Sequence, residues 1–320
     1  MIQRILLQPV ATVVRNTNNE EVSDMTAELT LEPYRFQNIY MITTYRCNWD
    51  CDFCLFKHNK EEEASIVHML SQLAYSIDGS DKPAYLKITG GEPFLCPDLL
   101  RAVFALCRLE KESIYKVGIG TNGSIPLPDY FRLLETPINI FLSRHTYPDE
   151  LPSVYDLKRD LYAPSVQFRI NCNLIRGQVD TLDKMKEHMR YHAVKSGVDQ
   201  FTFRELNHVT LEDNLFYPRQ IYGYVDYYQK HLVPVAQIEE EMARDPEFEL
   251  SRITGNAYDT NRWYWWNRPD APRVSVKFRI IDEQKLVNYN RVTEGVDEYV
   301  IHPDGTLTGC WDKDLKLIRR

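Results

Sequence analysis

The alternation of apolar strand segments with helical segments between residues 37 and 205 constrains the fold more than any other sequence feature. Six stretches read as strands, at 38–44, 84–89, 115–120, 138–143, 166–174 and 200–205. Helical periodicity falls between them, at 63–77, 98–109 and 181–195. Such repeats form parallel sheets, because each helix returns the chain to the same edge. We therefore predict an α/β fold, a partial (β/α)6 TIM-like barrel with its chemistry at the carboxyl ends of the strands.

The flanking segments predict a short arm and a small cap. We assign residues 1–36 to an N-terminal arm, 37–219 to the core and 220–320 to a C-terminal α+β cap. In the cap we expect helices at 221–232 and 236–244, an irregular aromatic stretch at 257–272, and then short antiparallel strands. Large apolar side chains are normally buried. We expect three of them to dock the cap on the open side of the barrel: Trp263, Trp265 and Trp266.

Three cysteines in eight residues follow the first predicted strand. Cys47, Cys51 and Cys54 have the spacing C-x-x-x-C-x-x-C, and thiolates gathered at one loop suit a soft metal or a cluster. Structural zinc sites are closed by four ligands, usually as two pairs. The alternative of a zinc site therefore depends on His58 as a fourth ligand. A cluster held by three cysteines would keep one iron open to a small molecule.

A second motif, Gly90-Gly91-Glu92-Pro93, follows the second predicted strand. Together with the cysteine spacing, it resembles the GGEP segment of the radical S-adenosylmethionine (radical SAM) enzymes, over about residues 36–210. The resemblance implies a [4Fe-4S] cluster on the three cysteines and S-adenosylmethionine on the open iron. It also implies cofactor contacts from Phe53 and from the Gly90, Gly91 and Glu92 turn, whose glycines let the backbone approach a ligand.

Further candidate residues lie at later strand ends. Thr121-Asn122-Gly123 resembles the T-N-G segment of relatives in the molybdenum cofactor biosynthesis protein A and SPASM branch, and Ser143 ends the fourth strand. On the fifth strand, Arg169, Asn171 and Asn173 share one face by the period of two. A polar strand face requires a polar cavity, because an unsatisfied buried polar group costs about 1–3 kcal/mol. We predict cofactor contacts from Thr121, Ser143, Arg169 and Asn171.

Two residues are candidates for chemistry on the substrate. His145 follows the fourth strand, where an imidazole suits proton transfer, and ordinary solvated-loop packing is the alternative for this segment. Cys310 lies in the last predicted hairpin, where it could return a hydrogen atom to a substrate radical. Ordinary burial is the alternative for this thiol. The companion cysteines that an auxiliary cluster would need do not follow Cys310.

Composition limits the location and the partners. A net charge of −8 argues against a protein that holds long nucleic acid by phosphate contacts. The sequence has no apolar run of about 18 residues and no signal peptide, so we expect a cytoplasmic protein that binds no membrane. Seven cysteines in a chain of 320 residues do not form a disulfide framework, which fits a reducing compartment.

The resemblance implies an enzyme that takes an electron from a donor such as flavodoxin or ferredoxin. It would cleave S-adenosylmethionine to a 5′-deoxyadenosyl radical that removes hydrogen from its substrate. As the substrate we favour a small polar or anionic metabolite, a nucleotide or amino-acid derivative. Relatives that modify peptides commonly carry a leader-binding domain, and none is visible in this sequence. Modification of a ribosomal peptide is one alternative. A non-catalytic iron-sulfur or zinc protein is the alternative from another class.

Overall fold

The computed structural model describes the core of the chain and parts of its C-terminal third. The described residues are 36–54, 56, 62–79, 82–129, 131, 136–146, 165–206, 222–255, 259–269, 271–281, 298–309, 311 and 317–319. They belong to one compact unit, Leu31–Arg320. Residues 1–35 of the predicted N-terminal arm lie outside the described residues, and so do His58 and Cys310.

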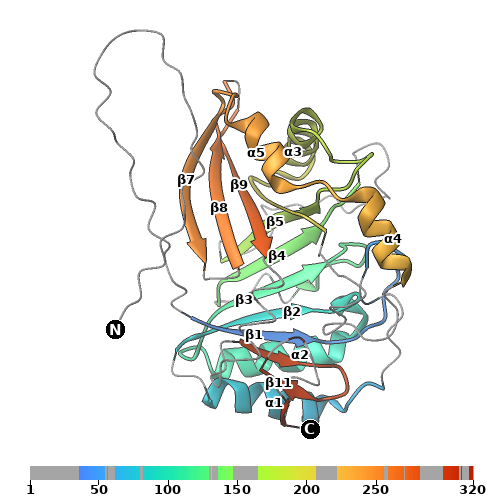
Figure 1. The fold of residues 1–320 in the computed structure, drawn as a ribbon. Coiled ribbons are helices and arrows are strands. Elements are labelled where there is room, and N and C mark those ends of the chain that lie inside the picture. Colours follow the sequence, from blue (N-terminus) through green and yellow to red (C-terminus); the bar gives the residue numbers. More distant parts are fainter. Residues whose placement is uncertain are drawn as a thin grey trace, which may run out of the picture. The chain divides into compact units, whose positions relative to one another are not determined.

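Six parallel strands form the centre of a single sheet (Figure 1). They are β1 (Gln37–Ile42), β2 (Ala84–Thr89), β3 (Ile114–Thr121), β4 (Ile138–Ser143), β5 (Val166–Asn173) and β6 (Gln200–Arg204). Each pairs in parallel with the next along the chain. The strand order has two free ends, so the sheet is not closed. The predicted α/β partial barrel is confirmed, with strand ends within about two residues of those expected.

Three helices cover the outer face of these strands. They are α1 (Ile66–Asp78), α2 (Pro97–Leu109) and α3 (Leu182–Ser196), and a short 3-10 turn, η1 (Pro93–Leu95), precedes α2. The Ser65 hydroxyl caps α1 by accepting from the His68 amide, and the Thr181 hydroxyl caps α3 in the same way. α1 and α2 pack together beside β1 and β2 (Figure 1). Side chains from β1 to β6 and these helices form the apolar core.

The C-terminal third differs from the expected cap. After α4 (Tyr222–His231) and α5 (Val235–Met242) come β7 (Phe248–Gly255), β8 (Asp259–Trp266) and β9 (Val274–Ile281). β9 pairs in parallel with β6, and β8 and β7 follow as antiparallel neighbours. At the other edge β10 (Glu298–Ile301) pairs in parallel with β1, followed by β11 (Leu307–Thr308) and β12 (Leu317–Arg319). These strands extend the core sheet at both edges.

The prediction of an irregular stretch at 257–272 was wrong, because its residues 259–266 form the regular strand β8. Its sequence hides the strand, since large aromatic residues occupy both faces and remove the apolar–polar alternation. Trp263 and Trp265 line the cavity inside the sheet, whereas Trp266 is fully buried and stacks on Phe248 at 5.9 Å. The Trp266 indole N–H also donates to Glu247.

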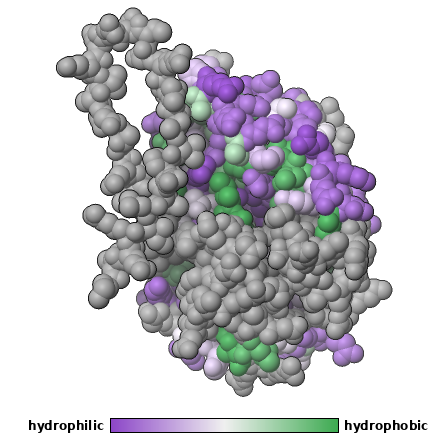
Figure 2. Space-filling model, in the orientation of Figure 1, coloured by the Kyte–Doolittle hydropathy of each residue, from purple (hydrophilic) through white to green (hydrophobic). Residues whose placement is uncertain are grey.

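The two faces of each strand have different chemistry. On β5, Phe168, Ile170 and Cys172 are buried against the core, while Arg169 and Asn171 line the cavity. This is the side-chain period of two that the sequence indicates. The described residues in the upper half of Figure 2 are mostly hydrophilic. No described helix is both long enough and apolar enough to cross a membrane.

Candidate active site

The three clustered cysteines line one large cavity on the inner face of the sheet. The cavity has a volume of about 1260 Å³, and Cys47, Cys51 and Cys54 all contribute to its wall. They lie on the segment that follows β1, residues 43–54, which we call the cysteine loop. Cys47 is exposed and the other two are half-buried. Their thiols are therefore open to a bound group from the cavity.

The Gly90-Gly91 turn packs directly against the cysteine loop. The Gly91 amide donates to the Thr44 carbonyl at 2.7 Å, and the Glu92 amide donates to the Arg46 carbonyl at 2.9 Å. A Cβ atom on Gly91 would clash with that Arg46 carbonyl, and Gly90 has a φ of +136°. Only glycine fits this approach and this backbone conformation. The motif thus holds the loop against the end of β2, and both glycines also line the cavity.

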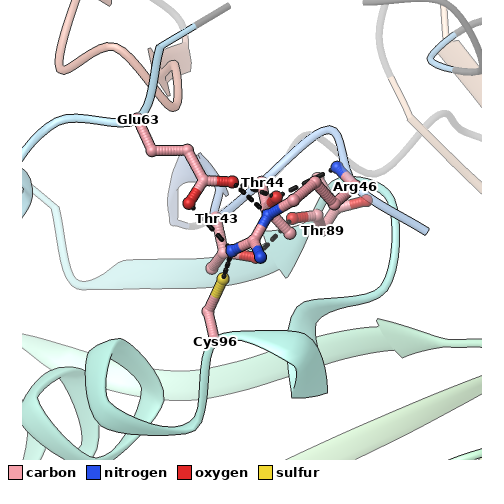
Figure 3. Close-up of polar contacts among 6 residues, drawn as sticks. All are labelled: Thr43, Thr44, Arg46, Glu63, Thr89 and Cys96. Carbon is pink, nitrogen blue, oxygen red and sulfur yellow. Dashed lines mark hydrogen bonds and ion pairs between the residues drawn. The ribbon is translucent and has the colours of Figure 1, made fainter. Parts of the chain in front are cut away.

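An ion pair fixes the start of the cysteine loop on the other side (Figure 3). The Arg46 guanidinium donates to both Glu63 carboxylate oxygens at 2.9 Å. Thr44 also donates to Glu63, and the Arg46 amide donates to the Thr44 hydroxyl at 3.0 Å. Arg46 further contacts the Cys96 sulfur at 3.7 Å. The residue next to Cys47 is therefore tied to the segment before α1.

Glu92 is fully buried, and its carboxylate accepts hydrogen bonds from three groups of the protein. Oε1 accepts from the Thr121 hydroxyl at 2.8 Å and from the Phe94 amide at 3.1 Å, and Oε2 accepts from the Asn122 amide at 2.8 Å. Burial raises the pKa of Glu92, and these hydrogen bonds and the charge of Arg144 offset part of that rise. Glu92 joins the end of β2 to the end of β3. A direct contact between its carboxylate and a cofactor stays a prediction.

Asn122 carries this connection to the cysteines, and the sequence reasoning did not single it out. Its Nδ2 donates to the Asn48 Oδ1 at 2.8 Å and to the Cys47 sulfur at 3.7 Å. Its backbone carbonyl accepts from Arg144 at 2.6 Å. Arg144 is buried, so its guanidinium holds the end of β3 in place. The amide in T-N-G was the available signal, because amide N–H groups are donors to cluster sulfur atoms.

Phe53 and His145 meet in the cavity wall. The Phe53 ring packs edge-on against the imidazole at 4.6 Å, and both residues line the cavity. Nδ1 of His145 accepts from the Asn173 amide at 2.9 Å. Burial, and then the charge of Arg204, holds the pKa of His145 well below its usual range. The imidazole is therefore neutral, with its proton on Nε2.

The other predicted cofactor residues also reach the cavity, from three neighbouring strands. They are Thr121 on β3, Ser143 on β4, and Arg169 and Asn171 on β5. Oδ1 of Asn171 is buried and has no hydrogen-bond partner among the described residues. Ser143 and Asn171 are register partners across β4 and β5. An orphaned amide oxygen beside a hydroxyl suits the donors of a polar ligand.

These observations fit the cluster and the nucleoside cofactor that the motifs imply. Three thiols, a donor to the Cys47 sulfur and the unsatisfied oxygen of Asn171 line one cavity. Thiolates are the usual protein ligands of iron-sulfur clusters. Within the described part of the chain, no three Cys, His, Asp or Glu side chains are arranged around a single metal-ion position. In a cubane each thiolate has its own iron, so the three sulfurs need not meet at one point.

A family model described as the radical SAM superfamily matches residues 41–172, which include the cysteine loop, the Gly90–Glu92 turn and most of β5. A 7-carboxy-7-deazaguanine synthase from Methanothermobacter thermautotrophicus is 32% identical over 82 residues, which are 25% of this chain and 31% of that protein. A probable GTP 3′,8-cyclase from Sulfurisphaera tokodaii is 26% identical over 196 residues, which are 56% of this chain and 59% of that protein.

Solved structures show the same fold over most of the chain. SuiB from Streptococcus suis bound to S-adenosylmethionine has a TM-score of 0.52 at 15% identity, covering 86% of this chain and 60% of SuiB. SuiB bound to the precursor peptide SuiA has a TM-score of 0.53 at 14% identity, covering 88% and 60%. The chain thus spans less than two thirds of the length of these relatives. With its motifs on adjacent strand ends and the match over residues 41–172, this region of the chain resembles the radical SAM superfamily, whose cofactors are a [4Fe-4S] cluster and S-adenosylmethionine.

Proposed function

We propose that this protein is a radical SAM enzyme acting on a small polar or anionic metabolite, a nucleotide or amino-acid derivative. The observation that carries the proposal is the shared cavity, which Cys47, Cys51 and Cys54 line together with the polar inner faces of β4, β5 and β6. The cluster with S-adenosylmethionine would supply one-electron cleavage to a 5′-deoxyadenosyl radical that abstracts hydrogen. The cavity then has room for a cofactor and a substrate side by side.

The protein's own residues would bind and orient the two cofactors and shield them from water. Cys47, Cys51 and Cys54 would ligate the cluster, with Asn122 donating to the Cys47 sulfur. Gly90 and Gly91 keep the cysteine loop close to the end of β2. The unpaired oxygen of Asn171 would accept a hydrogen bond from the cofactor, and the hydroxyls of Ser143 and Thr121 would donate to its polar groups or accept from them. Phe53 would pack on the adenine ring of the cofactor. The aromatic wall from β8 would help exclude water.

For His145 we propose a narrower role than the proton transfer expected from sequence. In the neutral imidazole, Nδ1 accepts a hydrogen bond from the Asn173 amide, so only the N–H on Nε2 can donate to a ligand. A donor that holds its proton at neutral pH can orient a polar group of the cofactor or substrate. Cys310 as a hydrogen-atom donor remains part of the proposal, as do a cytoplasmic location and a flavodoxin or ferredoxin as electron donor.

Peptide modification is the second candidate, because SuiB has the same fold and was solved with its precursor peptide. The cavity lining favours the metabolite, since polar and charged side chains predominate on β5, β7 and β9. A role as a non-catalytic iron-sulfur or zinc protein is the remaining alternative. It predicts metal binding without cleavage of S-adenosylmethionine.

Anaerobic reconstitution tests the proposal. The wild-type protein should bind about four irons and absorb broadly near about 400 nm, and dithionite should release 5′-deoxyadenosine from S-adenosylmethionine. Changing Cys47, Cys51 and Cys54 together to Ala should abolish both. The matched control is Cys107→Ala, at a buried thiol in α2, which should keep both. A full cluster in the triple variant, or a reduced cluster that never cleaves S-adenosylmethionine, would contradict the proposal.

A further inference from the structure

Basic side chains dominate the charged part of the cavity wall, although the whole chain is acidic. Seven lysines and arginines line the cavity: Lys87, Lys116, Arg169, Arg204, Arg252, Lys277 and Arg279. Two acidic residues line it, Asp259 and Glu298. The chain carries a net charge of −8, so this local excess runs against the composition. A cavity that concentrates one sign of charge attracts ligands of the opposite sign.

Three of these cations surround one indole ring. The Arg252 guanidinium lies 4.7 Å from the centroid of Trp263, that of Arg169 lies 5.2 Å away, and the Lys277 amine lies 5.3 Å away. The cations come from β7, β5 and β9, and Trp263 is on β8 (Figure 1). Each cation is attracted to the electron-rich face of the ring. Three positive charges around the same ring nevertheless repel one another.

No described carboxylate forms an ion pair with any of these three cations. Arg169 donates to the neutral Gln200 amide oxygen at 2.7 Å, and its Nε is buried without a partner. Within the described residues, Arg252 and Lys277 make no ion pair. The nearby Asp259 is already engaged by Arg279, at 2.9 and 3.1 Å. The guanidinium N–H groups are therefore available to an acceptor in the cavity.

The electrostatics of Lys277 agree with this geometry. Burial, followed by the charges of Arg169 and Arg279, holds the pKa of Lys277 well below its usual range. Asp259 raises that pKa and Lys87 lowers it further. A partly desolvated lysine among like charges favours its neutral form. A bound anion would remove this penalty and restore the positive charge.

Resting on the proposed function, we infer that Arg169, Arg252 and Lys277 bind a phosphate group of the substrate, with Trp263 packed among the three side chains. Phosphate matches the cluster better than a carboxylate does, because it can carry two charges and offers three oxygens to several donors at once. Arginine binds phosphate through two parallel N–H groups and lysine binds it as a point charge. The cysteine loop lines the same cavity, so a phosphate bound here would anchor the substrate beside the cofactor.

The test measures binding of inorganic pyrophosphate to the anaerobically reconstituted protein by isothermal titration. Lys277→Gln and Arg252→Gln should each weaken binding about 10-fold or more, since a hydrogen bond to a charged group contributes about 1.5–3 kcal/mol. Lys111→Gln, at an exposed position before β3, is the matched control and should leave the affinity unchanged. Lys277→Arg should restore part of the affinity, because it keeps the charge. Affinity should also fall with added salt.

Equal pyrophosphate affinity in the wild type, Lys277→Gln and Arg252→Gln would overturn the inference, and so would tighter binding of malonate than of pyrophosphate. Arg252 is exposed, so its variant carries the test if Lys277→Gln does not fold. Absorbance near about 400 nm and release of 5′-deoxyadenosine are measured on the same samples. Their loss in the wild type would contradict the proposed function, whereas an unchanged pyrophosphate affinity beside normal cofactor chemistry contradicts the phosphate site alone.

Discussion

Replacing Glu92 by Ala should destabilise the protein, because its carboxylate is the buried junction between the ends of β2 and β3. The change leaves two backbone amides, those of Phe94 and Asn122, without their acceptor. An unsatisfied buried donor costs about 1–3 kcal/mol. Removing a buried charge, whose raised pKa shows that burial disfavours it, returns part of this cost. We expect a loss of about 2–4 kcal/mol in the free energy of unfolding.

Urea denaturation followed by circular dichroism measures this loss, and titration with S-adenosylmethionine on the same samples measures cofactor affinity. The control is Glu112→Ala at an exposed position, which should change the free energy of unfolding by less than about 0.5 kcal/mol. Glu92→Gln keeps the shape but presents an amide NH2 group to one of the donors, so its stability should lie between those of wild type and Glu92→Ala.

An unchanged urea midpoint in Glu92→Ala together with weaker S-adenosylmethionine binding would refute the reasoning. That combination would mean that the carboxylate binds the cofactor and that its internal hydrogen bonds add nothing to stability. A lower midpoint with disturbed iron binding would instead support the path from Glu92 through Asn122 to Cys47.

Three further changes test the site and its support. Gly91→Ala should impair cluster assembly, measured as iron content, because the new methyl group would clash with the cysteine loop. The control is Gly120→Ala, whose new methyl group would have no atom closer than 3.8 Å. Asn122→Ala removes a donor to the Cys47 sulfur and should lower the cluster's reduction potential, measured by EPR titration. His188, whose pKa is lowered to about 3 by burial, takes up a proton on unfolding. This uptake alone should lower the free energy of unfolding by about 2 kcal/mol between about pH 6.5 and 5. The decrease measured by urea denaturation should therefore be smaller in His188→Gln than in wild type.

Much of the core could be predicted because its strands are apolar on the face that meets the helices. β2 and β4 have the predicted bounds, and the helix caps at Ser65 and Thr181 are visible as sequence signals. β9 was expected as a strand, but its partner was not. In Val274–Ile281 the residues Lys277 and Arg279 alternate with buried Val276 and Phe278, which indicates one polar cavity face. Periodicity gives the face of a strand and not its neighbour, so parallel pairing with β6 could not be predicted.

The candidate site likewise has features that the sequence predicts and features that it does not. The three cysteines and the Gly90-Gly91 turn follow from spacing, because motifs at the ends of neighbouring parallel strands lie close together. The burial of Glu92 does not follow, since a carboxylate in a turn reads as a ligand until its three donors are placed. The cations around Trp263 were missed for a related reason. Arg169, Arg252 and Lys277 are far apart in sequence and meet only because β7 to β9 continue the sheet beyond β6.

Because both neighbours of the core sheet, β9 and β10, come from the end of the chain, the order of synthesis matters. Tyr45 contacts His302 across 257 positions of sequence, at 3.4 Å. Until residues 274–301 have left the ribosome, β1 and β6 are bare strand edges, which invite pairing with other chains. Contacts this distant in sequence also make folding slow. The nascent protein is therefore expected to need protection by chaperones, and a truncation at residue 219 would leave both edges permanently open to aggregation.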